Sequence, residues 1–362
     1  MNNFASKTCK SYGKIAVLIC TVFPFLSCMN DISGRSNPFD LNNPNNIGKC
    51  RIITVNYANN GALYKSLDGG TTWFPKASIY AHPVRSASAI ASSADGTKLV
   101  ATWQVGYLYT SSDSGNTWVW RNVSGDTNYW SSVVTSADGS KILASDYKNG
   151  AQPSSGYLYY SSNSGVSWIQ ETSFGMYYCS QVAMSSDGKK MAAQEAGLGH
   201  TYIFTNGGGS GGWGNSGNLD GGTSHQFNAV VYSADGTRLI VAAQMDYIYT
   251  STDDGVSWTK RTGAGTGVLT LAVSSNGMRI IAVDNQNFTV GYIYTSVDGG
   301  ATWVQRTSAG LRYWRGVACT PDGMNVVAGV NAGYLYSSSD GGVTWKELAG
   351  VTTACISLVI YK

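Results

Sequence analysis

Charged residues are scarce in this sequence. They make up 12% of its 362 residues, against roughly a quarter in an average soluble domain. The 24 Lys and Arg residues nearly balance the 21 Asp and Glu residues, and no basic stripe marks a surface for nucleic acid. We therefore expect no nucleic-acid partner.

Residues that support metal or acid–base chemistry are also few. The three histidines, His82, His200 and His225, stand at no spacing typical of metal ligands, so a zinc site is not expected. The chain has no glycine-rich phosphate loop and no strained serine turn of the hydrolase type. These absences favour a protein without a metal or cofactor. Glutamate, one of the residue types that could act as an acid or base, is also scarce and occurs only as Glu171, Glu195 and Glu347.

A short motif recurs along the chain and predicts its fold. In the stretch 107–118, side chains alternate as in a β-strand and a tight turn follows. Asp113 is expected to accept backbone hydrogen bonds across this turn, and Gly115 to take the left-handed conformation. Ser111 and Thr117 are expected to bond across the mouth of the turn, with the closing tryptophan as an apolar anchor. We call this eight-residue motif, S-x-D-x-G-x-[ST]-W, the box.

Seven boxes occur at steps of 42 to 50 residues, which is about the length of a four-stranded propeller blade. The third box has Asn163 at the Asp position. The fourth has Gly208 there but keeps Trp213 in register, so we interpret it as a degenerate blade. The other five keep an aspartate that we expect to be structural: Asp68, Asp113, Asp253, Asp298 and Asp340.

A second turn alternates with the box. It is Asp-Gly or Asn-Gly between apolar runs, which is a strong hairpin signal. Each unit therefore has four strands, with this turn between the first two and the box between the last two. Both turns then lie on one face of the propeller, the turn face, and the other connections lie on the loop face. The turn residues are Asp95, Asp138, Asp187, Asp235, Asn276 and Asp322.

Seven boxes with only six Asp-Gly turns leave one hairpin incomplete. The shortest interval from such a turn to the next box aspartate is 18 residues, and 18 residues before Asp68 stands Cys50, where a strand-like run begins. The chain ends on another strand-like run, 356–361, that has no turn of its own. We therefore predict an all-β, seven-bladed propeller over residues 50–362, closed by the last strand in the first blade.

The seven cysteines do not suggest a disulfide framework. Three lie in the N-terminal segment, and two fall near opposite ends of strands expected to pair. The remaining two, Cys179 and Cys319, belong to different blades. Buried free thiols are the expected state.

The N-terminal segment is expected to direct export. Residues 1–28 place lysines before an apolar run, as secretory signals do. The run 25–28, Phe-Leu-Ser-Cys, resembles the lipobox of bacterial lipoproteins, in which Cys28 becomes the lipidated first residue. The alternatives are an ordinary signal peptide or an uncleaved anchor, although the run is too short to favour a full membrane span. Residues 29–49, rich in Asn and Pro, are expected to be a tether. The expected location is the bacterial cell envelope, by a lipid anchor at the outer membrane or surface, or outside the cell.

Three carboxylates interrupt the repeat on the loop face. Asp146, Glu195 and Asp284 share one register position, at which other blades have residues such as Trp103, and they fall in the blades with longer loops. Acids beside enlarged loops are candidates for a glycan or cation site, or for general acid–base catalysis. The alternative is that each acid starts its loop by bonding its own backbone.

Aromatic residues and arginines gather where the chain enters the first strand of several blades. Such residues, if exposed, form a stacking platform for a sugar or an anchor for a protein. The alternative is packing between neighbouring blades. In contrast, Arg121, Arg261 and Arg306 each stand three residues after a box Trp, and a repeated position indicates a scaffold role. The candidate ligand-binding residues are Trp103, Trp130, Tyr147, Tyr178, Arg312, Tyr313, Trp314 and Arg315.

The boxes resemble the Asp-box, or bacterial neuraminidase, repeat family over about residues 50–362. This resemblance implies the propeller fold but leaves the function open, because the family includes sialidases, other glycoside hydrolases, sortilin-type receptors and a photosystem II assembly factor. Sialidases carry an Arg-Ile-Pro motif, an arginine triad and a Tyr/Glu pair. Here Arg51-Ile52 is followed by Ile53, and glutamate is scarce, so both departures count against sialidase activity.

We expect a monomeric, lipid-anchored propeller that binds a glycan or a protein through its loop face without catalysis. Its only expected contact with a membrane is the lipid anchor. The alternative is a glycoside hydrolase that uses Asp146, Glu195 or Asp284.

Overall fold

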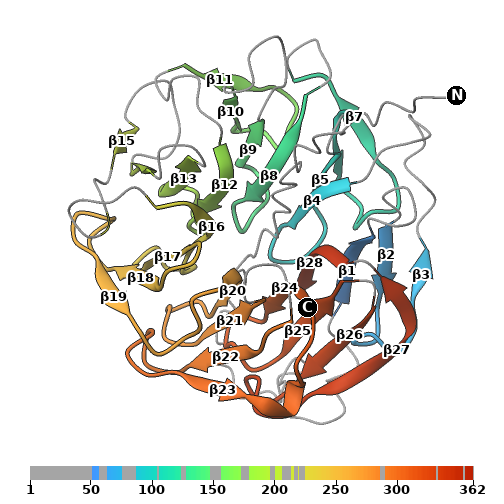
Figure 1. The fold of residues 1–362 in the computed structure, drawn as a ribbon. Helices are drawn as coiled ribbons and strands as arrows, with labels where there is room; N and C mark the ends of the chain where they lie inside the picture. The colour runs from blue at the N-terminus through green and yellow to red at the C-terminus, as the bar shows by residue number, and fades with distance from the viewer. Residues whose placement is uncertain are drawn as a thin grey trace, which may run out of the picture.

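The computed structural model describes residues 51–56, 63–75, 87–103, 106–123, 128–146, 156–172, 179–195, 200–205, 213–215, 219, 225–285, 290–331, 333–353 and 355–361. These residues form seven four-stranded antiparallel sheets, arranged as blades around a central axis (Figure 1). The fold class predicted from the repeats is confirmed. Cys28, Tyr147 and Tyr178 lie outside the described residues, as do the expected signal and tether.

Four blades come from the first part of the chain, and blade 1 also contains β28 (Cys355–Tyr361), the last strand of the chain. Blade 1 has the order β28, β1 (Arg51–Asn56), β2 (Leu63–Ser66) and β3 (Phe74–Pro75). Blade 2 consists of β4 (Ala87–Ser92), β5 (Leu99–Trp103), β6 (Leu108–Ser111) and β7 (Val119–Arg121). Blade 3 consists of β8 (Trp130–Thr135), β9 (Ile142–Asp146), β10 (Tyr157–Ser161) and β11 (Ile169–Glu171). Blade 4 consists of β12 (Cys179–Met184), β13 (Met191–Glu195), β14 (Thr201–Phe204) and β15 (Gly214–Asn215).

The remaining three blades follow in chain order. Blade 5 consists of β16 (Phe227–Tyr232), β17 (Leu239–Ala243), β18 (Ile248–Ser251) and β19 (Thr259–Arg261). Blade 6 consists of β20 (Val268–Val273), β21 (Ile280–Asp284), β22 (Ile293–Ser296) and β23 (Val304–Arg306), with the short 3-10 helix η2 (Thr307–Ala309) after it. Blade 7 consists of β24 (Trp314–Cys319), β25 (Val326–Val330), β26 (Gly333–Ser338) and β27 (Lys346–Thr353). Among the described residues, no helix has the length and hydrophobicity to cross a lipid bilayer.

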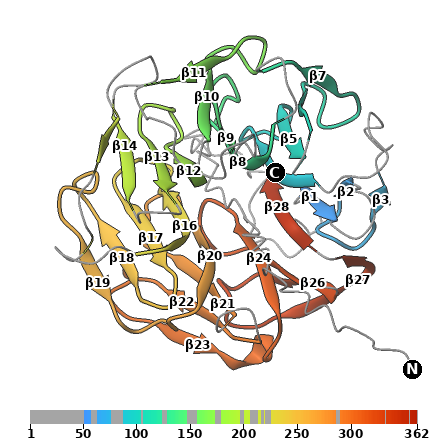
Figure 2. The ribbon, with the colours of Figure 1, turned by 45° about the horizontal axis from the view of Figure 1, so that its top comes forward.

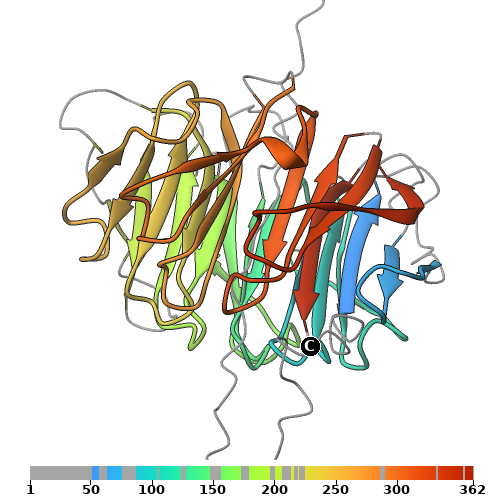
Figure 3. The same ribbon diagram turned by 90° about the horizontal axis from the view of Figure 1, so that it is seen from below.

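The propeller closes through its last strand, as predicted from the count of seven boxes and six Asp-Gly turns. β28 pairs antiparallel with β1, with Ile360 opposite Ile52 and Val359 opposite Ile53. In Figure 2 the red β28 therefore lies beside the blue β1, although they come from opposite ends of the chain. Seen edge-on, the strands run along the axis of the ring (Figure 3). This pairing leaves no open sheet edge at the join.

The hydrophobic core lies mainly between blades. The innermost strands of blades 2 to 7 have almost every residue buried, and apolar side chains of one sheet pack against the next. Between blades 5 and 6, for example, Ile240 and Ile248 share a cluster with Leu271 and Ile280. Cys179 and Cys319 are buried and free, as predicted for thiols in different blades.

Each box is organised around its aspartate. In the box of blade 2, the Ser111 hydroxyl donates to Asp113 Oδ1 at 2.8 Å, and the Thr117 hydroxyl donates to Oδ2 at 2.6 Å. Both hydroxyls therefore donate to the carboxylate of Asp113. The sequence-based expectation that they bond to each other across the turn was wrong. The Thr117 N–H also donates to Asp113 at 2.8 Å, and Gly115 takes the left-handed conformation with φ 81°. One carboxylate thus fixes both sides of the turn.

The same pattern recurs in the boxes of blades 1, 3, 5, 6 and 7. In blade 3, Asn163 accepts from the Ser167 N–H at 2.9 Å and donates to its hydroxyl at 2.8 Å, so a neutral amide preserves the turn. The predicted scaffold role of the repeated arginines is also confirmed. Each donates Nε to a threonine hydroxyl of its own blade, as in the pairs Arg121–Thr110, Arg261–Thr250 and Arg306–Thr295.

The degenerate fourth box keeps its tryptophan for a reason that the structure supplies. Blade 3 has Glu171 at the position of the repeated arginine, and this side chain is only 2% exposed. Burial raises the pKa of Glu171, and a hydrogen bond from the Trp213 indole partly offsets this effect. Trp213 therefore contributes a donor to a buried carboxyl of the neighbouring blade.

The Asp-Gly turns are joined to one another around the turn face. Backbone hydrogen bonds of 2.7 to 3.0 Å run between neighbouring turns from blade 2 to blade 7. They are Ala94 N–H to Ala137 C=O, Ala137 N–H to Ser186 C=O, Ser186 N–H to Ala234 C=O, Asp235 N–H to Ser275 C=O and Ser275 N–H to Pro321 C=O. Blade 1 has no such turn, and there the Tyr361 ring packs on Gly96, where a Cβ would collide with it. The polar backbone of this face is thus largely committed to holding the ring.

The box carboxylates predict how stability depends on pH. Hydrogen bonds from the Thr117 side chain and backbone lower the pKa of Asp113 from 3.8 to about 2. Because the folded pKa lies below the unfolded value, the stabilisation is present above pH 3.8 and is lost as the pH falls towards 2. Asp113→Asn should therefore reduce stability at pH 6 but have little effect near pH 2, because the amide keeps the turn as Asn163 does. Urea unfolding at both pH values tests this, and an equal loss at both would contradict the linkage.

Candidate functional site

The three loop-face carboxylates lie at the ends of second strands, each of which pairs with the innermost strand of its blade. Asp146 pairs with Trp130, Glu195 with Cys179, and Asp284 with Val268, each just before a β-bulge in the innermost strand. Trp103 holds the same position opposite Ala87. The structure therefore confirms the common register of these residues, at the loop-face end of their blades.

Asp146 and Asp284 are covered by the chain. Asp146 is fully buried, and its Oδ1 accepts the backbone N–H of Tyr129 at 2.8 Å. This bond anchors the entry into β8, so the acid binds the backbone of the preceding connection. Asp284 is 2% exposed, and the connection from blade 5 lies against it so closely that a Cβ at Gly265 would collide with its carboxylate. Both carboxylates thus serve local packing.

Glu195 belongs to a polar network within blade 4. It is 3% exposed, and its Oε2 lies 3.3 Å from His200 Nδ1 and 3.4 Å from the Tyr202 hydroxyl. The His200 side chain is 27% exposed, which makes it the solvent-facing member. Sequence reasoning missed this group because the three residues meet across a hairpin, at spacings that no common motif uses.

The tryptophans of the predicted platform are buried. Trp314 is fully buried, with ring centroids 5.3 Å from Tyr336 and 6.2 Å from Trp345. Trp130 is 1% exposed, and its indole N–H donates to the Gly106 carbonyl at 3.2 Å. Trp103 is 9% exposed and packs edge-on against a tyrosine of its own blade. This arrangement agrees with the packing alternative, because none of the three rings offers an exposed face.

A pair of half-buried arginines lies at the entry to blade 7. The Arg312 guanidinium stands 4.4 Å above the Tyr336 ring and donates Nε to the Ala309 carbonyl of η2 at 3.1 Å. Arg315, at the bulge of β24, lies 4.8 Å above the Tyr313 ring and donates to its hydroxyl at 3.3 Å. Stacking on tyrosines holds both guanidinium groups in place.

Among the residues that the structure describes, the surroundings of this pair leave one buried guanidinium nitrogen without a partner. The Arg315 Nε is buried and has no hydrogen-bond partner within the described part of the chain. The nearby Glu347 accepts the Tyr336 hydroxyl at 2.7 Å. Burial first, and then this bond, raise the pKa of Tyr336 to about 12, against the opposing charge of Arg312. We call Arg312, Tyr313, Arg315 and Tyr336 the arginine cluster; Tyr336 and Glu347 were missed because they come from the far strands of the blade.

A second charged group on blade 5 is self-contained. Lys260 lies 3.2 Å from Asp246 and 4.5 Å above the Tyr247 ring, while the Asp246 carboxylate also meets His225 at 3.2 Å and the Tyr249 hydroxyl at 2.8 Å. Burial alone raises the pKa of Asp246, but the bonds from Tyr249, the Tyr247 backbone and Lys260 lower it overall. Its charges are matched internally, so this group offers less to an ionic ligand than the arginine cluster.

No cluster of three or more His, Cys, Asp or Glu side chains suited to a metal ion occurs among the residues that the structure describes. The arginine cluster is therefore the strongest candidate site on the loop face. Its donors are cationic and held on rigid elements, which suits binding of an anionic group.

Known proteins resemble this chain in fold and hardly in sequence. No protein-family model matches it, and no curated protein does. A solved structure of YCF48 bound to D1 peptide is 17% identical with a TM-score of 0.56, covering 78% of this chain and 85% of its own. YCF48 from Cyanidioschyzon merolae is also 17% identical, with a TM-score of 0.55 and coverage of 74% and 86%. A chain in a nidogen/laminin complex is 10% identical, with a TM-score of 0.53 and coverage of 86% and 98%. At these identities the likeness establishes the propeller fold alone.

Proposed function

We propose that this protein is an exported, lipid-anchored propeller that binds a protein segment at its loop face without catalysis. The observation that carries the proposal is the arginine cluster, in which two half-buried guanidinium groups stack on tyrosines at the entry to blade 7. Arginine and tyrosine are the residues enriched at protein-binding hot spots. An acidic side chain of a partner would pair with the guanidinium groups.

Two further observations support binding over catalysis. The acids Asp146 and Asp284 are buried under the chain's own backbone, where a substrate has no access to them. A propeller with the same fold has been solved with a peptide bound, as the YCF48 structure illustrates. A glycan remains the second ligand class to test, and glycoside hydrolysis through Glu195 remains the alternative activity.

The test compares a loop-face variant with a turn-face control on the same probes. Arg312→Gln with Arg315→Gln should weaken binding to acidic peptides on a peptide array by about 2 kcal/mol, roughly thirtyfold. Lys189→Gln removes an exposed cation of the turn face and should change neither binding nor melting temperature. Equal binding by the double variant would contradict the proposal. Binding to a glycan array alone would replace the protein partner by a glycan, and hydrolysis of chromogenic glycosides that Glu195→Gln abolishes would establish the enzyme.

Lipid anchoring is proposed from the lipobox resemblance at residues 25–28. Cys28→Ala should abolish lipid attachment, because only the cysteine thiol accepts a diacylglycerol. Uptake of labelled fatty acid and partition into membranes measure this directly. A Cys9→Ala variant serves as the matched control and should still be labelled. Labelling of the Cys28→Ala protein would contradict the anchor.

We also propose that the chain is a divergent member of the Asp-box repeat family, acting as a monomer. The hydrogen-bond pattern shared by six boxes supports the family membership.

A further inference from the structure

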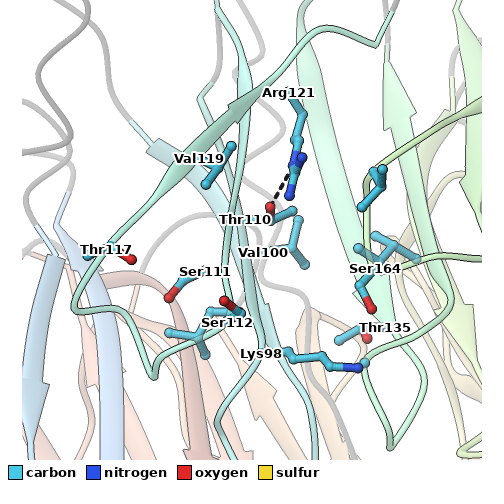
Figure 4. A pocket seen from close by; sticks show the side chains of 14 residues that line it. Lys98, Val100, Thr110, Ser111, Ser112, Thr117, Val119, Arg121, Thr135 and Ser164 are labelled. Carbon is cyan, nitrogen blue, oxygen red and sulfur yellow. Dashed lines mark hydrogen bonds between the residues drawn. The ribbon is translucent and has the colours of Figure 1, made fainter.

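A pocket of about 270 Å³ lies between blades 2 and 3 on the turn face (Figure 4). Lys98 and Arg121 of blade 2 line it together with hydroxyl side chains, and Ser164 of blade 3 lines the opposite wall. Its lining contains no carboxylate. Its lining therefore carries two positive charges and no negative one, and its volume suits a small ligand or a single side chain.

The chain itself shows what fills the equivalent space between blades 4 and 5. Lys98 and Lys190 both stand three residues after a turn aspartate, and both donate Nζ to a carbonyl of the next Asp-Gly turn, at 2.9 and 2.8 Å. Lys190 has in addition a carboxylate partner, because its Nζ lies 2.9 Å from Asp254 Oδ2. Asp254 is the fourth residue of the box in the blade after that of Lys190, and Ser164 is the fourth residue of the box in the blade after that of Lys98. The pocket thus lies where the carboxylate is missing.

Two other gaps are filled in a different way. Between blades 5 and 6 the long side chain of Arg238 reaches Gly299, with Nη1 2.9 Å from the place of a Cβ there. Between blades 6 and 7 Arg279 reaches Gly341 in the same manner, at 3.1 Å. Both glycines hold the fourth position of their boxes. Among these four gaps, the one between blades 2 and 3 has neither the acid nor the arginine.

We propose that this pocket binds a carboxylate, which completes the coordination of Lys98 as Asp254 completes that of Lys190. The ammonium group has three N–H donors, and one is used by the Asp138 carbonyl. Arg121 stands at the other end of the pocket (Figure 4) and uses Nε for Thr110 at 2.8 Å. This bond occupies one of its five N–H donors, so the guanidinium can receive a second acceptor of the ligand.

The Asp138 carboxylate lies close enough to Lys98 for the lysine charge to act on it. Burial alone raises its pKa, but bonds from Ser136 and Ser140, with the charge of Lys98, lower it to about 2. Its oxygens are taken by those serines at 2.6 to 2.9 Å. It therefore does not fill the pocket as Asp254 fills its counterpart. The ligand carboxylate comes either from a free small acid or from an acidic side chain of a partner.

Ser164→Asp is the decisive variant, because it rebuilds the pair that the chain already uses elsewhere. Ser164 has φ 58° and Asp254 has φ 56°, so aspartate fits this backbone. The new carboxylate should pair with Lys98 and close the pocket without lowering the melting temperature. Calorimetric titration uses succinate and its diamide as free probes, and a blocked Gly-Asp-Gly peptide and its Asn counterpart as side-chain probes.

Wild type should bind a carboxylate probe at least tenfold more tightly than the matched amide, and Ser164→Asp should lose at least tenfold of that affinity. Lys98→Met should lose as much, whereas the double variant of Arg312 and Arg315 should bind these probes unchanged, which separates this site from the loop face. Binding of succinate alone identifies a free acid as the source, and binding of the peptide alone identifies a partner side chain. Equal binding of acid and amide, no binding, or full affinity in folded Ser164→Asp would overturn the proposal.

Discussion

Deleting β28 should abolish cooperative folding of the whole propeller, although it removes only the last few residues. β28 is the innermost strand of blade 1 and pairs with β1 over most of its length. Without it, the buried Ile52 and Ile53 lose their partners and β1 becomes an exposed edge that is prone to pair with other chains. A truncated chain ending at residue 354 should aggregate or show no cooperative transition in a calorimetric melt.

Two substitutions at Tyr361 make this test specific for packing. The side chain is 1% exposed, and its hydroxyl has no hydrogen-bond partner in the part of the chain that the structure describes. Tyr361→Ala removes the ring that packs on Gly96 and should cost roughly 3–5 kcal/mol, whereas Tyr361→Phe should be neutral or slightly stabilising. A monomeric truncated chain with an unchanged melting temperature would contradict closure through β28.

Trp314→Ala should cost roughly 3–5 kcal/mol of the free energy of unfolding. Trp314 is fully buried between Tyr336 and Trp345, and it belongs to the apolar cluster shared by blades 6 and 7. Removing the indole leaves a cavity between blades 6 and 7. The closed propeller is rigid, so its blades move together only far enough to fill this cavity in part. Urea unfolding of the purified variant measures the loss.

Trp314→Phe is the matched control. The indole Nε1 is buried without a hydrogen-bond partner within the described residues, so phenylalanine loses ring volume but no hydrogen bond. Its cost should be clearly smaller than that of alanine. An unchanged free energy of unfolding in Trp314→Ala, together with weaker ligand binding, would instead support a role of this residue as a stacking platform.

The repeats made the fold predictable, because each box and each Asp-Gly turn encodes its own hairpin. Their spacing gave the number of blades, and the missing turn before Asp68 predicted the strand exchange. The error over Ser111 and Thr117 was local, since both hydroxyls can be expected near the turn but only coordinates show that they share Asp113. The sequence thus predicts which side chains form hydrogen bonds in the turn, but not which atoms they bond to.

The candidate site was less predictable, because residues of one type can face a ligand or a neighbouring blade. Trp314 and Arg315 are adjacent in sequence, yet the first is fully buried and the second half-exposed beside a bulge. The position of the bulge decides which side chain points outward. The partners Tyr336 and Glu347 come from strands of blade 7 remote in sequence, so no spacing rule reveals them.

The interblade pocket could be found only by comparing equivalent positions in space. Asp254 and Ser164 occupy the same place in their boxes, but the consequence depends on which lysine of the preceding blade reaches them. The sequence shows the substitution without showing the contact that it removes.

Hydrogen–deuterium exchange of the wild-type protein with an acidic peptide selected from the array tests the central claim most directly. If the loop face binds the partner and the turn face mainly holds the ring, exchange should slow in residues 309–315 and 333–338 around the arginine cluster. The box turns away from the interblade pocket, such as 251–258, should then exchange as in the unbound protein. Slower exchange confined to the box turns, with no change around Arg312 and Arg315, would contradict the account.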